Sequence, residues 1–148
     1  DKGEKESFGF FEVMVAIPPN REIVSMQIVS TRDSLRVFGG FRRSAPPRIA
    51  IVDPRPGDRL GTRTTVKWEV TDPDTPLGDL LFQVAYSPNG GTNWVPIGVD
   101  IKGNSFTFNS DEIQNSRENG VIRVYVSDGL NTAFADVTKL VTTAARYQ

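Results

Sequence analysis

The stretch TTVKWEVTD, residues 64–72, alternates apolar and polar side chains. In an extended chain, successive side chains point to opposite faces, so residues two apart share a face. One face of this stretch carries Val66, Trp68 and Val70, and the other carries polar or charged side chains. The pattern predicts a β-strand with its apolar face in a core and its polar face in water.

Seven runs of this kind lie between Arg48 and Val141, with turn residues between them at intervals of roughly ten residues. They are RIAIVDP (48–54), TTVKWEVTD (64–72), DLLFQVAYS (79–87), NWVPIGV (93–99), NSFTFN (104–109), GVIRVYVSD (120–128) and NTAFADVTKLV (131–141). Seven short strands in about 100 residues is the number typical of an immunoglobulin-like β-sandwich. We therefore expect an all-β, seven-stranded sandwich in residues 46–148.

The core of this sandwich is expected to form from the inward rows of four runs. These rows are Val66, Trp68 and Val70; Leu80, Phe82, Val84 and Tyr86; Phe106 and Phe108; and Ile122, Val124 and Val126. The aromatic side chains among them, Trp68 above all, are interpreted as packing residues.

A separate β segment precedes the sandwich. FGFFEVMVAI (8–17), EIVSMQIVS (22–30) and LRVFGGF (35–41) predict a three-stranded β-meander. Consecutive prolines in RRSAPP, residues 42–47, disfavour helix and strand pairing and mark the boundary, so we assign residues 1–45 to the meander. A segment of this size is too small for a core of its own. It either packs on the sandwich or, as we prefer, ends a preceding domain.

Composition narrows the classes of function. Seventeen basic and eighteen acidic residues leave a net charge of −1, so nothing indicates a surface for nucleic acid or an anionic membrane. The chain has no cysteine and no histidine, which removes disulfides, zinc–thiolate sites and the Ser-His-Asp triad. Hydrolysis would have to rely on carboxylates alone, as in a glycosidase, but Asp72, Asp79 and Asp128 are expected in exposed turns and not across a cleft. We therefore expect no enzymatic activity and no catalytic cofactor.

The start of the sequence leads us to expect a piece of a longer protein. It begins with DKGEKES, which is neither an initiator methionine nor a signal peptide. No run approaches the roughly 18 apolar residues that would span a bilayer. We expect that the targeting information lies outside this sequence.

Five motifs occur in the order found in a known group of modules: VKWEV (66–70), DPD (72–74), VAYS (84–87), GGTNW (90–94) and IRVYVSDG (122–129). Together they resemble the fibronectin type III-like and immunoglobulin-like modules of large secreted or surface bacterial proteins. The resemblance implies an extracellular, non-catalytic accessory domain with a neighbouring domain, such as a peptidase or glycosidase, in the same parent protein. One departure is Ile122, where fibronectin type III domains usually carry a corner tyrosine.

SPNGGTNW, residues 87–94, resembles the Asp-box hairpin of sialidases and related propellers. Ser87, Gly91 and Trp94 match that pattern, and Asn89 stands at the aspartate position. The resemblance implies a structural turn, in which short polar side chains bond the turn's own backbone and the tryptophan packs beneath it. A single copy does not make a propeller.

Two further turns are expected. Asp128 and Gly129, within SDGLN (127–131), predict a type I′ hairpin turn with positive φ at both central positions. SDEIQNS (110–116) predicts one helical turn capped by Ser110.

The acidic turns offer a calcium site as one hypothesis. In a sandwich of this type the loops after the second and sixth strands lie at the same end, so Asp72, Asp74 and Asp79 are expected near Asp128. Calcium prefers several hard oxygen ligands of this kind. The alternative is that all four carboxylates are ordinary solvated turn residues, because no EF-hand spacing is present.

Exposed aromatic side chains offer a glycan site as another hypothesis. Tyr86, Trp94 and Tyr125 are the candidate stacking platforms, and Arg123 lies on the same outward row as Tyr125. The alternative is that Tyr125 and Arg123 belong to a cross-strand packing pair.

The function expected from the sequence is a spacer, adhesion or docking module that contacts the neighbouring domain of its parent or a protein ligand. A carbohydrate-binding accessory module is the alternative. A large exposed aromatic patch would favour binding over spacing. If residues 8–41 lack their native partner, a strand-exchanged dimer of the chain is expected.

Overall fold

The computed structural model of the chain describes the following residues: 16, 18–21, 23–30, 32, 37–42 and 44–142. Within them the fold is all-β, and the single helical element is a 3₁₀ turn at Ser110–Glu112. The strands are β1 (Ser25–Val29), β2 (Val37–Arg42), β3 (Arg48–Asp53), β4 (Arg63–Thr71), β5 (Leu81–Ser87), β6 (Val95–Ile101), β7 (Ser105–Asn109), β8 (Gly120–Ser127) and β9 (Thr132–Leu140). None of the helical structure described there is long enough to cross a membrane.

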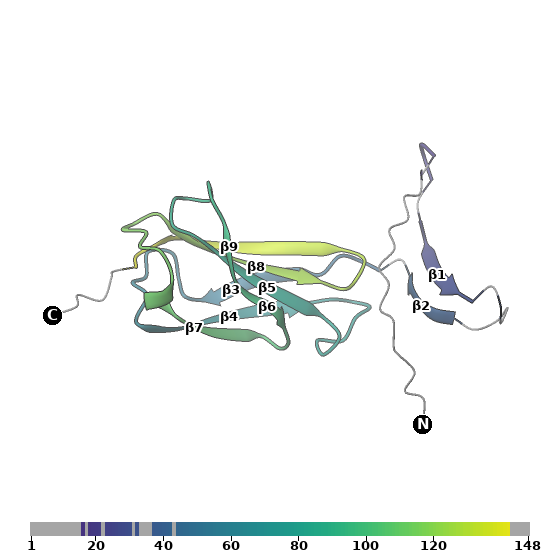
Figure 1. Cartoon of the computed structure of the whole chain (residues 1–148), viewed down its shortest axis with the longest axis horizontal. Coiled ribbons are helices and arrows are strands. Elements are labelled where there is room, and N and C mark those ends of the chain that lie inside the picture. Colours follow the sequence, from purple (N-terminus) through teal and green to yellow (C-terminus); the bar gives the residue numbers. More distant parts are fainter. Residues whose placement is uncertain are drawn as a thin grey trace, which may run out of the picture.

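Strands β3 to β9 form a sandwich of two antiparallel sheets (Figure 1). One sheet has the order β3-β4-β7 and the other the order β6-β5-β8-β9. All of these pairings are antiparallel. Short turns join the consecutive pairs, as antiparallel neighbours allow, whereas β4–β7 and β5–β8 are brought together by the fold. The predicted all-β sandwich is therefore confirmed, and each of the seven runs from Arg48 onward overlaps one strand.

The core lies between the two sheets and follows the period-two rows of the sequence. Trp68 of β4 and Phe82 of β5 face each other across it, with ring centroids 5.1 Å apart. Its largest fully buried side chains are those of Trp68, Tyr86, Phe82, Leu80, Ile122 and Leu140. The core also includes Leu60, between β3 and β4, and Leu140, at the end of β9, which the inward rows did not include. Most residues of the predicted inward rows are buried, whereas Val70, Phe106 and Phe108 are half-buried and pack against the core. Burial of the apolar face of each strand decides which way it turns.

Strands β1 and β2 form a separate two-stranded sheet outside the sandwich (Figure 1). Every residue of β1 is exposed, including Met26 at 47% and Ile28 at 42%. β1 lies within the predicted run 22–30, and β2 overlaps the predicted run 35–41 and ends one residue beyond it. Apart from Ala16, the predicted first strand, 8–17, lies outside the described residues. The three-stranded meander and the boundary at residues 45 and 46 stay predictions.

The turn between β8 and β9 differs from the predicted type I′ turn. Gly129 has a φ of 94°, but neither Asp128 nor Leu130 has a positive φ. The central pair is therefore Gly129 and Leu130, with positive φ at the first position only, as in a type II′ turn. The prediction was wrong by one residue because the Asp128 side chain caps the turn, accepting from the backbone N–H of Leu130 at 2.8 Å.

The cap of the 3₁₀ turn also differs from its prediction. Asn109 is the N-cap, and its side-chain oxygen accepts from the backbone N–H of Asp111 at 3.0 Å. Ser110 is buried instead, and its hydroxyl lies 3.0 Å from the Thr64 hydroxyl. Because this contact occupies Ser110, the residue before it takes the capping position.

Candidate functional site

The acidic turns at one end of the sandwich hold the segment that enters β3. The Asp72 carboxylate accepts from the backbone N–H groups of Asp74 and Thr75, at 2.9 and 2.7 Å. This closes the turn after β4 and directs Asp74 outward, where its carboxylate accepts from the backbone N–H of Ala45 at 2.7 Å. A turn of the sandwich thus binds the backbone of the entering segment.

Asp128 and Asn131, in the turn between β8 and β9, bind the same segment at Ser44. The Ser44 hydroxyl donates to the Asp128 carboxylate at 2.5 Å. The side-chain amide of Asn131 donates to the Ser44 carbonyl oxygen at 3.1 Å and to the Asp128 carboxylate at 2.9 Å. We call Ser44, Ala45, Asp74, Asp128 and Asn131 the linker clamp.

The clamp changes the acidity of Asp128. Burial raises the pKa of this carboxyl, but hydrogen bonds from Ser44, Asn131 and Leu130 outweigh it and lower the pKa to about 2. A carboxylate that accepts several hydrogen bonds is stabilised in its charged form. Asp128 is therefore ionised when it holds the linker at neutral pH.

The four carboxylates predicted for calcium are mostly engaged by these turn and linker bonds. Asp79 belongs to the next turn, where its backbone N–H donates to the Pro76 carbonyl oxygen at 2.9 Å. One oxygen of Asp72 is buried and has no hydrogen-bond partner among the described residues. Within that part of the chain, no three acidic side chains are grouped closely enough to hold a metal ion. Calcium binding stays a prediction, which a calorimetric titration would test.

The hairpin SPNGGTNW is held by its own short polar side chains. The buried Ser87 hydroxyl accepts from the backbone N–H of Gly91 at 2.8 Å and donates to the Asn89 side-chain oxygen at 3.0 Å. That oxygen also accepts from the backbone N–H of Asn93 at 2.9 Å. Gly91 has a φ of 92°, and a Cβ there would lie 3.4 Å from the Trp94 ring. The turn therefore fixes the position of Trp94, which directly precedes β6.

Trp94 lies in a cluster of rings around Arg123 on the outer face of the four-stranded sheet. The Arg123 guanidinium carbon lies 4.5 Å from the Trp94 ring centroid and 4.0 Å from that of Phe134. Two hydrogen bonds fix the guanidinium to the Asp136 carboxylate, at 2.7 and 2.8 Å. Hydrogen bonding to Asp136 raises the pKa of Arg123 above its ordinary value. The charged guanidinium of Arg123 is thus held in one orientation by Asp136 and packs against both rings.

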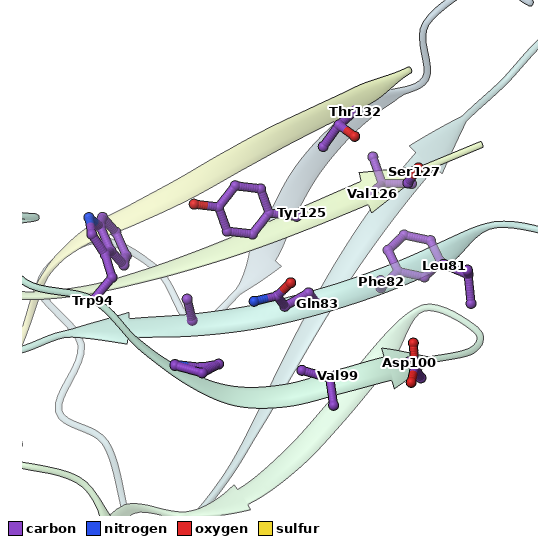
Figure 2. Close-up of a pocket in the computed structure, with 12 residues that line it drawn as sticks. Leu81, Phe82, Gln83, Trp94, Val99, Asp100, Tyr125, Val126, Ser127 and Thr132 are labelled. Carbon is purple, nitrogen blue, oxygen red and sulfur yellow. The ribbon is translucent and has the colours of Figure 1, made fainter. Parts of the chain in front are cut away.

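A groove of about 350 Å³ lies beside this cluster, on the outer face of β5, β6 and β8. Figure 2 shows Tyr125 and Gln83 on neighbouring strands, with Trp94 toward one end and Ser127 and Thr132 toward the other. Val99, 62% exposed, and Asp100 form the side of the groove that β6 contributes. We call this feature the outer-sheet groove.

The outcomes for the predicted stacking platforms differ. Trp94 and Tyr125 line the outer-sheet groove, and Arg123 lies against the rings of both. Tyr86, by contrast, is 1% exposed, so its expectation as a platform was wrong. It belongs to the inward row of β5, and its hydroxyl donates to the Gln114 carbonyl oxygen at 2.9 Å. Tyr86 of β5 therefore bonds the loop before β8. The position at which fibronectin type III domains usually carry a tyrosine is occupied by Ile122.

Several contributing residues had not been identified as site residues from the sequence. Gln83 and Asp100 line the groove, and Ser44 and Asn131 complete the linker clamp. Gln83 stands at an outward position between buried Phe82 and Val84. The alternation of apolar and polar residues along β5 could therefore have identified Gln83 as a residue of the outer face. Ser44 carries no local signal, because its partners are brought together only by the fold.

No protein-family model and no curated protein matches the chain. The crystal structure of an engineered protein is similar at 15% identity and a TM-score of 0.44, covering 68% of this chain and 21% of that one. An endo-β-1,4-mannanase from Thermotoga petrophila is similar at 12% identity and a TM-score of 0.47, covering 78% of this chain and 22% of the enzyme. The chain thus spans about a fifth of the length of each of these proteins.

Proposed function

We propose that this chain is a non-catalytic, fibronectin type III-like or immunoglobulin-like module of a larger secreted or surface bacterial protein. It acts as a spacer and docking domain that holds the preceding segment of its parent in a fixed position. The linker clamp carries this proposal, because it binds both the side chain and the backbone of the entering segment. A freely hinged connection needs no such bonds.

The strand order supports the finer assignment of the sandwich. Its fourth strand, β6, pairs with β5 and so joins the sheet of the third, sixth and seventh strands. In variable-type immunoglobulin domains an added strand joins the corresponding sheet in the same way. The remaining sheet holds the first, second and fifth strands, β3, β4 and β7.

The proposal is tested by the mobility of the Ala45 amide relative to the sandwich. We expect a backbone order parameter near 0.85, typical of rigid structure, in the whole chain. In the double variant Asp74→Ala, Asp128→Ala it should fall below about 0.6, the range of flexible segments. The matched control is Asp79→Ala, which removes a carboxylate from a neighbouring turn without removing a clamp bond. A low order parameter at Ala45 in the unaltered chain would refute the spacer role.

A further inference from the structure

We propose that the outer-sheet groove binds a neutral saccharide chain. This goes beyond the spacer role, which depends on the linker clamp at the end of the sandwich and not on this groove. The groove has a volume of about 350 Å³. This lies within the range of roughly 300–1,000 Å³ that is usual for small-molecule sites.

The two strands beneath the centre of the groove, β5 and β8, each have a paired neighbour on both sides, which limits the kind of recognition available there. β5 pairs with β6 on one side and β8 on the other, and β8 pairs with β5 and β9. An extended peptide that binds by strand addition needs a free sheet edge. The one edge close to the groove is that of β6, and it lies on the side of β6 away from β5. A ligand that lies over β5 and β8 must therefore be recognised by side chains.

The charges around the groove favour a neutral ligand. Among the residues that line it, Asp100 is the single charged one. Arg123 lies beside the groove, but its guanidinium is bonded to Asp136 through two nitrogens. An anionic ligand would meet the Asp100 carboxylate without a free cation to offset the repulsion.

The groove combines ring faces with polar groups that are free to bond. Tyr125 and Trp94 contribute rings, and Val99 adds apolar surface. Within the described residues, Gln83, Asp100 and Thr132 make no side-chain hydrogen bond. A pyranose ring has apolar C–H faces and a rim of hydroxyl groups, so it can stack on a ring while an amide, a carboxylate and a hydroxyl bond its rim.

The site is also organised before a ligand arrives. Arg123 holds Trp94 from one side, and Tyr125 packs against Phe134 with ring centroids 5.9 Å apart. Rings fixed in this way lose little conformational freedom on binding, which leaves more of the contact energy for affinity.

The test is an array of neutral glycans, followed by ¹⁵N NMR titration of the whole chain with the best binder. At about 10 mM glycan, a site with a millimolar Kd is largely saturated. We expect the Trp94 indole and Gln83 amide signals to shift. Tyr125→Ala and Gln83→Ala should each weaken binding by about tenfold or more, whereas Tyr125→Phe, which keeps the ring, should stay within about threefold.

The matched control for Gln83→Ala is Gln27→Ala, the same change on β1 outside the sandwich. The circular dichroism spectrum and melting temperature of each variant show that it is folded. The proposal is overturned if no neutral glycan binds, or if Tyr125→Ala binds as tightly as the unaltered chain. It is equally overturned if trigalacturonate or a proline-rich peptide shifts the groove signals at a lower concentration than the neutral glycan.

Discussion

Arg123 and Asp136 are cross-strand neighbours on β8 and β9, joined by two hydrogen bonds of 2.7 and 2.8 Å. Their side chains are 22% and 30% exposed, so solvent screens the pair in part. The same guanidinium lies against the rings of Trp94 and Phe134. Asp136 therefore fixes the guanidinium that packs against both rings, so the ion pair also helps to position these aromatic side chains.

A double-mutant cycle measures this link. We expect Arg123→Ala and Asp136→Ala to be coupled by about 0.5–1 kcal/mol in the free energy of urea unfolding, because partly exposed pairs are rarely worth more. In about 1 M salt, where the Debye length is about 3 Å, the coupling should shrink. Arg123→Ala should still cost more than Asp136→Ala, since it also removes contacts with two rings. Equal costs for the two single variants would contradict the stacking role.

Tyr86→Phe removes the buried hydroxyl that bonds the Gln114 carbonyl oxygen. We expect a loss of about 1–2 kcal/mol in the free energy of unfolding, because the carbonyl group is left without this donor. Tyr125→Phe is the matched control, since its hydroxyl has only a 3.5 Å contact with Arg123. That variant should stay within about 0.5 kcal/mol of the unaltered chain. Similar losses in both would show that the Gln114 bond contributes nothing specific.

The pH dependence of stability should reveal the low pKa of Asp128. This pKa is about 2 in the folded chain against an ordinary value of 3.8, so ionised Asp128 stabilises the folded state above about pH 4. That contribution is lost as pH falls from about 4 to about 2. After a discount for solvent screening, we expect Asp128→Asn to cost about 1 kcal/mol at neutral pH.

Chemical unfolding at a series of pH values checks this expectation. The difference in the free energy of unfolding between the unaltered chain and Asp128→Asn should become smaller as the pH falls from about 4 to about 2. Asp79→Asn controls for the general effect of removing a carboxylate at this end of the sandwich. If this difference in unfolding free energy is the same at neutral and acidic pH, the loss of stability in Asp128→Asn does not come from the charge of the carboxylate.

Gly120→Ala should be strongly destabilising. A Cβ at this position would lie 2.6 Å from the Leu140 carbonyl oxygen and 2.7 Å from the Ser116 hydroxyl. Because the carbonyl belongs to the paired strand, β8 and β9 would have to separate, at a cost of about 2 kcal/mol or more. Gly78→Ala is the matched control: no atom lies within 4 Å of its Cβ, and its φ is not positive. It should change stability by less than about 1 kcal/mol in thermal unfolding.

The sequence by itself determined the strands of the sandwich and the face that each one buries. Val66, Trp68, Phe82 and Val124 could all be assigned to the core because alternation is a local property of an extended chain. The turn SPNGGTNW was also predictable, since Ser87 and Asn89 bond backbone groups four residues further along the chain. Tyr86 fitted two roles, a core residue in the inward row of β5 and an exposed stacking platform. Its alternation with the buried residues of β5 indicated the core role that the structure shows.

Only the tertiary structure decided which distant residues act together. Ser44 and Asp128 are 84 positions apart, and Tyr86 and Gln114 are 28 apart. Likewise, Arg123 of β8 and Trp94, which precedes β6, meet only in the folded chain, where the guanidinium carbon lies 4.5 Å from the ring centroid. Such pairs depend on strand order and on the way loops fold back, which no local pattern encodes. The linker clamp and the outer-sheet groove therefore became visible once the sheets were assembled, although the strands that carry them had been predictable.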